Sequence, residues 1–161
     1  MGKRWAVVIG AAAVGVMALV ATGCGGDDDE ETTTAALSKQ EFIKQADQIC
    51  AKGDKQIDQA ARDVFAKGQK PSKQEQEQFV TDTVIPSIQK QVNEIDALPL
   101  PKESGGAPSD QEQINGIIDS AQNGLNKAEN NPALLTQPGS DPLAEATKLA
   151  KDYGLKVCGE G

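Results

Sequence analysis

Histidine is absent from this sequence, and aromatic residues make up only 3% of its 161 positions. Because histidine titrates nearest to neutral pH, its absence removes the most common general acid or base and a frequent metal ligand. The sequence also has no Gly-rich phosphate loop, nucleophile elbow or zinc-binding pattern. We therefore expect a protein that is not an enzyme and that binds no cofactor and no metal ion.

Cysteine and basic residues are also scarce. None of the three cysteines forms a Cys-x-x-Cys pair, which argues against a redox enzyme. The 16 Lys and Arg residues stand against 24 Asp and Glu residues, for a formal net charge of −8. A chain this acidic is a poor partner for the phosphate backbone of a nucleic acid.

What the sequence does contain begins with an apolar run from Ala6 to Ala21, directly after the basic residues Lys3 and Arg4. A basic start followed by an apolar stretch is typical of an export signal. At about 1.5 Å per residue a helix of this length spans roughly 24 Å of a hydrocarbon core that is about 30 Å thick. A permanent membrane anchor is the alternative, and the run is marginal for it.

The apolar run ends at ATGC, residues 21–24, which resembles the bacterial lipobox. In that motif small residues precede a cysteine that is diacylated and becomes the first residue of the mature protein. Ala21 stands where the motif prefers leucine. The resemblance implies a signal peptide over 1–23 and a lipid on Cys24 that attaches the protein to the extracytoplasmic face of the cell membrane. An ordinary secretory signal is the alternative.

Residues 24–37 fit a tether between that lipid and a folded domain. Two glycines are followed by DDDEE and TTTAA, so the segment combines flexibility and self-repulsion with few side chains that can form a core. As a coil it reaches about 20 Å. The acidic run lacks the sharply turned loop that a cation site needs, so we interpret it as a solvated spacer.

A lipid on Cys24 leaves Cys50 and Cys158 as the remaining cysteines of an exported protein. Thiols in an oxidising compartment form disulfides, and two cysteines do not complete a four-ligand zinc site. The sequence therefore predicts a Cys50–Cys158 disulfide that joins the C-terminal tail to the first helix of the domain.

Helix signals recur through 38–161. SKQE (38–41), SKQE (72–75) and SDQE (109–112) each match a capping box and precede apolar residues at helical spacing. They predict helices that end near Gly68, before the prolines that follow Leu98, and at the NNP sequence of residues 130–132. Pro86 lies inside the second helix and predicts either a kink or a break at which Pro86 restarts the helix.

A fourth helix is predicted from Asp141 as N-cap and Pro142 as first helical residue to Tyr153. Gly154 and Leu155 then suit a Schellman ending. Gly116 and Gly124 in the third helix either weaken it or allow close packing. The expected inward-facing residues are Phe42, Ala46, Ile49, Gly53, Ile57, Ala60, Val64, Val80, Val84, Ile88, Val92, Ile95, Leu98, Ile114, Ile117, Ile118, Ala121, Leu125, Ala128, Leu143, Ala146, Leu149, Ala150 and Tyr153.

EFIKQADQIC (41–50) and YGLKVCG (153–159), behind the lipobox and the acidic tether, resemble the small helical lipoproteins common in actinobacteria. Members of that family are mostly uncharacterised. The resemblance implies export and an all-α architecture, and it brings no catalytic residue. Together with the helix signals it predicts a small four-helix bundle over 38–161.

The sequence constrains the function less than it constrains the fold. Carboxylate pairs such as Asp47 with Asp54, Asp58 with Asp63, or Glu75 with Glu77 lie among Lys and Gln, so we interpret them as solvated helix faces, and the glutamines as polar surface. We expect a non-catalytic interaction module that docks an envelope protein or polymer. The alternative is a carrier of a small apolar ligand between the helices, which needs spare volume, whereas the small core residues favour close helix approach.

Overall fold

The computed structural model describes residues 36–65, 71–103, 105–106 and 108–160. The predicted signal peptide, Cys24 and the acidic run of the tether lie outside the described residues. Within these ranges the protein is a small all-α bundle, as predicted, and its one extended pairing is a bridge between Leu37 and Pro101. Leu37, the last residue assigned to the tether, therefore belongs to the folded domain.

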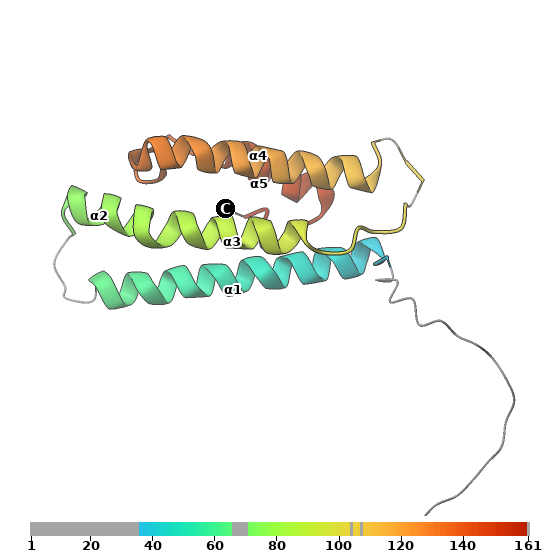
Figure 1. Ribbon diagram of the computed structural model, residues 1–161, viewed down its shortest axis with the longest axis horizontal. Helices are drawn as coiled ribbons and strands as arrows, with labels where there is room; N and C mark the ends of the chain where they lie inside the picture. Colours follow the sequence, from blue (N-terminus) through green and yellow to red (C-terminus); the bar gives the residue numbers. More distant parts are fainter. Residues whose placement is uncertain (1–35, 66–70, 104, 107, 161) are drawn as a thin grey trace, which may run out of the picture. The chain divides into compact units, whose positions relative to one another are not determined.

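Within the described residues the bundle has four helical segments, which Figure 1 shows. The first is α1, Lys39–Phe65, and the second runs without interruption through α2, η1 and α3, which are Lys73–Phe79, Val80–Val84 and Ile85–Asp96. The third is α4, Asp110–Asn130, which a 3-10 turn, η2, Pro132–Leu135, follows, and the fourth is α5, Ala144–Tyr153. α3 contacts α1 on one side and α4 on the other, and α5 runs along α4.

All three predicted capping boxes form. At the start of α1, the Ser38 hydroxyl accepts from the backbone N–H of Glu41 at 3.2 Å, and the Glu41 carboxylate accepts from the Ser38 N–H at 2.9 Å. Ser72 and Ser109 make the same pair of bonds at α2 and α4. Each box satisfies two backbone groups that a helix start would otherwise leave without partners, so these helices begin where the sequence says.

Pro86 produces a change of helical register where a kink or a break was expected. The turn before it is a π-helix, in which the N–H of Ile85 donates to the carbonyl of Val80, five residues back. Proline has no N–H for the regular bond, and the wider turn adds one residue to the repeat. As a consequence Ile85 is buried, whereas Val84, which we expected to face inward, is only partly buried.

The fourth helix begins later than predicted. Asp141 does act as a cap, because its carboxylate accepts from the N–H of Leu143 at 2.9 Å, but this closes a turn over residues 141–143. The helix itself starts at Ala144. Its end is as predicted: Gly154 has a φ of +110°, and the N–H of Leu155 donates to the carbonyl of Ala150 at 2.9 Å, which completes a Schellman ending.

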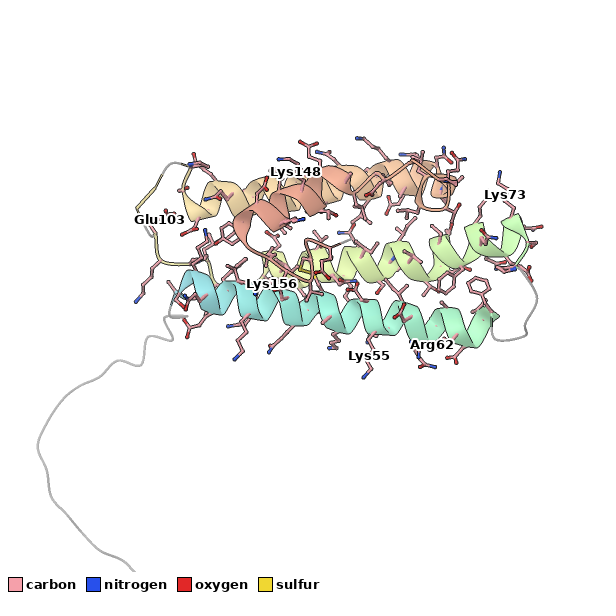
Figure 2. All side chains as sticks on the ribbon, turned by 180° about the vertical axis from the view of Figure 1, so that it is seen from behind. Lys55, Arg62, Lys73, Glu103, Lys148 and Lys156 are labelled. Atoms are coloured by element: carbon pink, nitrogen blue, oxygen red, sulfur yellow. A yellow bond between two sulfur atoms is a disulfide. The ribbon has the colours of Figure 1, made fainter. Side chains whose placement is uncertain are left out.

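The core lies where the four segments meet, and most of the predicted inward residues contribute to it. Val64 was expected to face inward but is 52% exposed. Its neighbour Phe65 makes the contact at this end of α1, with its ring centroid 5.1 Å from that of Phe79. Charged side chains such as those of Lys55 and Lys148 project away from the bundle (Figure 2).

Candidate functional site

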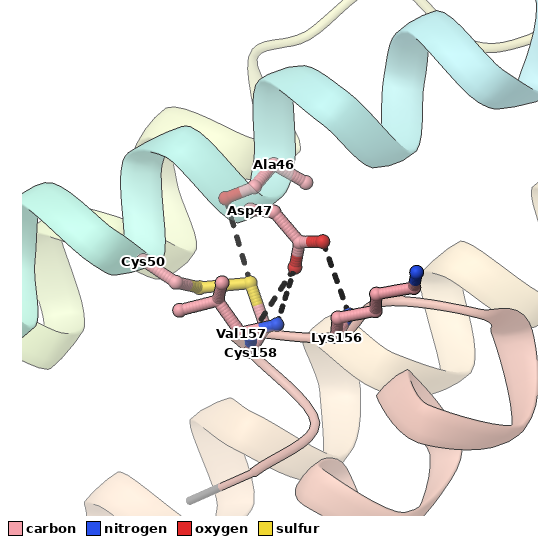
Figure 3. Close-up of a disulfide and its surroundings, with 6 residues drawn as sticks. All are labelled: Ala46, Asp47, Cys50, Lys156, Val157 and Cys158. Atoms are coloured by element: carbon pink, nitrogen blue, oxygen red, sulfur yellow. Dashed lines mark hydrogen bonds between the residues drawn. A yellow bond between two sulfur atoms is a disulfide. The ribbon is translucent and has the colours of Figure 1, made fainter.

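The C-terminal tail crosses back to the middle of α1 and is fixed there by a disulfide. Cys50 and Cys158 are bonded across 108 residues of sequence, with their α-carbons 5.4 Å apart (Figure 3). The predicted Cys50–Cys158 disulfide is therefore confirmed. Cys50 is buried beside the core, so the bond anchors the tail to the body of the domain and not to its surface.

A second attachment lies one turn earlier on α1. The carboxylate of Asp47 accepts hydrogen bonds from the backbone N–H groups of Lys156, Val157 and Cys158, at 3.0, 2.9 and 3.3 Å (Figure 3). Hydrogen bonds to an ionised acceptor are stronger than neutral ones. Asp47 was one of the carboxylates assigned to a solvated face, and it is instead the residue that orients the tail.

The tail closes one side of a cavity of about 410 Å³ between α1, α3, α4 and α5. This is within the usual range of roughly 300–1,000 Å³ for small-molecule sites. Most of the lining is apolar, and it includes Ile57, Ile88, Ile95, Ile117, Leu143 and Val157. The bundle thus has spare volume next to the disulfide, where the sequence favoured close helix approach.

Close approach does occur at two glycines beside this cavity. A Cβ atom at Gly124 would collide with the backbone carbonyl of Pro142, so glycine allows the turn before α5 to lie directly on α4. A Cβ atom at Gly53 would collide with the side-chain amide of Gln91. Of the two roles considered for Gly124, the structure supports close packing.

Gln91 is a buried polar side chain in the mostly apolar wall of the cavity. It lies on α3, lines the cavity and is only 8% exposed. Its Nε2 atom is buried and has no hydrogen-bond partner among the described residues. A buried donor left without a partner is costly in free energy. The sequence interpretation placed glutamines on the surface, yet the spacing Ile88, Gln91, Ile95 puts this one on the inward stripe and could have identified it.

Two carboxylates also line the cavity. Asp54 and Asp58 are one turn apart on α1, and both are exposed, so the cavity reaches the surface beside them. Partial burial raises the pKa of Asp54, and the neighbouring charge of Asp58 raises it further. Asp58 has one loose ion pair, with Arg62 at 3.9 Å, in which both side chains are more than 70% exposed. Such a pair neutralises little of the local charge.

The other carboxylates considered from the sequence do not line the cavity. Asp63 accepts from the Gln59 side chain at 3.0 Å on the surface, and Glu75 closes the capping box of α2. In the described part of the chain no three His, Cys, Asp or Glu side chains are grouped closely enough to hold a metal ion. Asp54 and Asp58 are the acidic residues that line the cavity.

A separate polar cluster joins three helix ends. Asp110, whose side chain is 1% exposed, forms an ion pair with Lys39 at 3.0 Å, and the same ammonium lies 4.0 Å from the ring centroid of Tyr153. Burial raises the pKa of Tyr153, and the charge of Asp110 raises it further. These three residues are not part of the cavity lining, and their mutual contacts indicate a structural role in holding α1, α4 and α5 together.

Across 36–65, 71–103 and 108–160 no helix is both long and apolar enough to cross a membrane. Comparison of the chain with protein-family models, with curated proteins and with solved structures finds no match.

Proposed function

We propose that the protein is an exported lipoprotein that carries a small apolar ligand between its helices, without catalysing a reaction. The observation that carries the proposal is the cavity of about 410 Å³ beside the Cys50–Cys158 disulfide. The free energy of an apolar ligand falls when it leaves water, and the cavity offers it apolar walls on α1, α3, α4 and α5.

The proposed location depends on the sequence. Cys24 follows the apolar run as a lipidated cysteine would, and the acidic tether of roughly 20 Å would hold the bundle close to the membrane surface. A ligand that partitions into the membrane could then enter the cavity without a long passage through water. This arrangement supports a carrier or a receptor for molecules of the cell envelope.

The docking of an envelope protein or polymer has less support. Among the described residues, the large apolar side chains that are more than a third exposed are Val64 and Leu100. Sites for protein partners are commonly marked by contiguous apolar patches. We therefore prefer the ligand carrier, which was the alternative on sequence grounds.

The proposal is tested by the molecules that purify with the protein. The full chain is isolated from membranes and extracted with organic solvent, and the extract is analysed by mass spectrometry for the wild type and two variants. Ala146 is buried and lines the cavity, so Ala146→Phe reduces its volume, whereas Ala144→Phe places the same ring on the exposed side of α5.

We expect an apolar molecule in stoichiometric amount with the wild type and with Ala144→Phe, and its loss from Ala146→Phe. Both variants must unfold cooperatively in a thermal melt for the comparison to be made. An apolar molecule that stays with Ala146→Phe, or its absence from the wild type, would refute the proposed carrier function.

A further inference from the structure

We infer that the ligand is a single-chain amphiphile whose polar end is an ammonium group, and that this group binds the carboxylates of Asp54 and Asp58 where the cavity opens to the surface. This inference deepens the proposed carrier function and rests on it. It also states which amphiphiles the cavity disfavours, namely those whose polar end is a carboxylate.

The first argument is the charge of the cavity lining. The charged residues among the described lining residues are Asp54 and Asp58, both on α1, and none of these lining residues is Lys or Arg. The rest of the lining is mostly apolar. In small-molecule sites of this kind, a few polar groups in an apolar wall fix the orientation of the ligand. Here both charges are negative, so they attract a cation and repel a carboxylate.

The second argument is the position of the two carboxylates. Asp54 and Asp58 are exposed, whereas Ile95, Ile118 and Ala150, which line the same cavity, are buried. An alkyl chain can therefore leave water against the buried walls while its polar end stays at the opening. An ammonium group in that place keeps part of its hydration, so it avoids most of the desolvation cost of a buried charge.

The third argument is that the two carboxylates have little compensation from the protein itself. Asp54 forms no ion pair with any described residue, and Asp58 has the loose pair with Arg62 at 3.9 Å. Figure 2 shows that the side chain of Lys55 points away from the bundle. The acceptor oxygens beside the cavity are therefore accessible to a cationic ligand.

The fourth argument is the repulsion between the two side chains. Like charges one turn apart destabilise a helix, and the pKa of Asp54 is raised by burial and by the charge of Asp58. An ionised carboxylate is an acceptor only, whereas an ammonium group has three N–H donors and can bind both carboxylates. A metal ion such as Ca²⁺ needs more ligands, and the described residues contain no group of three acidic, His or Cys side chains placed to hold one.

The test compares three probes with the same alkyl chain: dodecylammonium, 1-dodecanol and dodecanoate. The full chain is bound to phosphatidylcholine vesicles, each probe is added at a small mole fraction of the lipid, and the unfolding temperature is followed by circular dichroism. A ligand that binds only the folded state raises this temperature according to its affinity. Because ion pairs with exposed carboxylates contribute modestly, we expect dodecylammonium to bind about two- to tenfold more tightly than dodecanol, and dodecanoate to bind least.

Two matched double variants test the role of the carboxylates. Asp54→Asn/Asp58→Asn removes the charges beside the cavity, and it should abolish the preference for dodecylammonium while leaving dodecanol binding unchanged. Asp63→Asn/Asp119→Asn is the control, because it causes the same change in net charge at two exposed residues that do not line the cavity. It should keep the full preference. Each shift is measured from the unfolding temperature of the same variant without probe.

Each contrary outcome has a defined meaning. Equal binding of dodecylammonium and dodecanol, tightest binding of dodecanoate, or the same preference in the two double variants overturns the ammonium end but leaves the apolar carrier intact. Ala146→Phe should abolish stabilisation by dodecylammonium, and stabilisation that persists there overturns binding in the cavity. Stabilisation by none of the probes overturns the inference, whereas the carrier function is then decided by the co-purified molecules.

Discussion

The carboxylate of Asp47 accepts a hydrogen bond of 2.9 Å from the backbone N–H of Val157, 110 residues further along the chain. With the disulfide one turn later on α1, this bond fixes both the position and the direction of the C-terminal tail. Val157 is part of the cavity wall, so the two attachments also determine the shape of the candidate ligand site.

Removal of the disulfide should destabilise the domain. In the double variant Cys50→Ala/Cys158→Ala we expect the free energy of unfolding to fall by about 2–5 kcal/mol, because the unfolded chain loses a long covalent loop. Urea titration measures the change. Intact mass with and without reductant, followed by alkylation, counts the thiols of the native protein, and two free thiols would contradict the intramolecular bond.

Asp47→Asn should weaken the attachment of the tail while leaving the disulfide in place. The amide keeps one acceptor oxygen but loses the charge that three N–H groups share, so a loss of about 1–3 kcal/mol in unfolding free energy is expected. Hydrogen exchange should show faster exchange at Lys156, Val157 and Cys158. Asp63→Asn serves as control. Equal exchange rates at these three N–H groups in both variants would contradict the proposed role of Asp47 in holding the tail.

Lys39→Met should leave the buried carboxylate of Asp110 without its ion-pair partner. We expect a loss of about 2 kcal/mol, below the range for fully buried pairs because the Lys39 side chain is 36% exposed. The second variant, Lys39→Met/Asp110→Asn, removes both charges and should regain part of the loss. Thermal and urea unfolding measure the free energy of unfolding of both variants. If Asp110→Asn lowers this free energy further in the Lys39→Met background, the two charges are not coupled.

Stability should decrease at alkaline pH through Tyr153. Its pKa is raised in the folded state above the ordinary value of about 10, so the folded protein holds this proton more tightly than the unfolded chain does. The contribution of this proton to the free energy of unfolding is fully present below pH 10 and is lost as the pH rises toward the pKa of Tyr153 in the folded state. Urea unfolding between pH 8 and about 11 should show a smaller decrease for Tyr153→Phe. An identical slope would refute the assignment.

Cys24→Ser should release the protein from the membrane fraction or leave it as an unprocessed precursor, because serine offers no thiol for the lipid. Fractionation and intact-mass analysis of the mature N-terminus check this prediction. A Cys24→Ser protein that is processed and retained like the wild type would show that another feature attaches the chain to the membrane.

Local signals were predictable because they act within one helical turn. The capping boxes at Ser38, Ser72 and Ser109 and the Schellman ending at Gly154 form as expected, since each satisfies backbone groups only a few residues away. The π turn before Pro86 was not predictable from the sequence. Whether a helix bends, breaks or takes up a π turn depends on which of Val84 and Ile85 the neighbouring helices can bury.

The sequence by itself determined the four helical segments, the three capping boxes and, through the cysteine count, the Cys50–Cys158 bond. These follow from short-range hydrogen bonding, apolar periodicity and the pairing of two thiols. The tertiary structure decided that Asp47 binds the tail, that Gln91 is buried and that a cavity remains beside Asp54. Each of these depends on how distant helices meet, because the same polar side chain is solvated or enclosed according to what packs across from it.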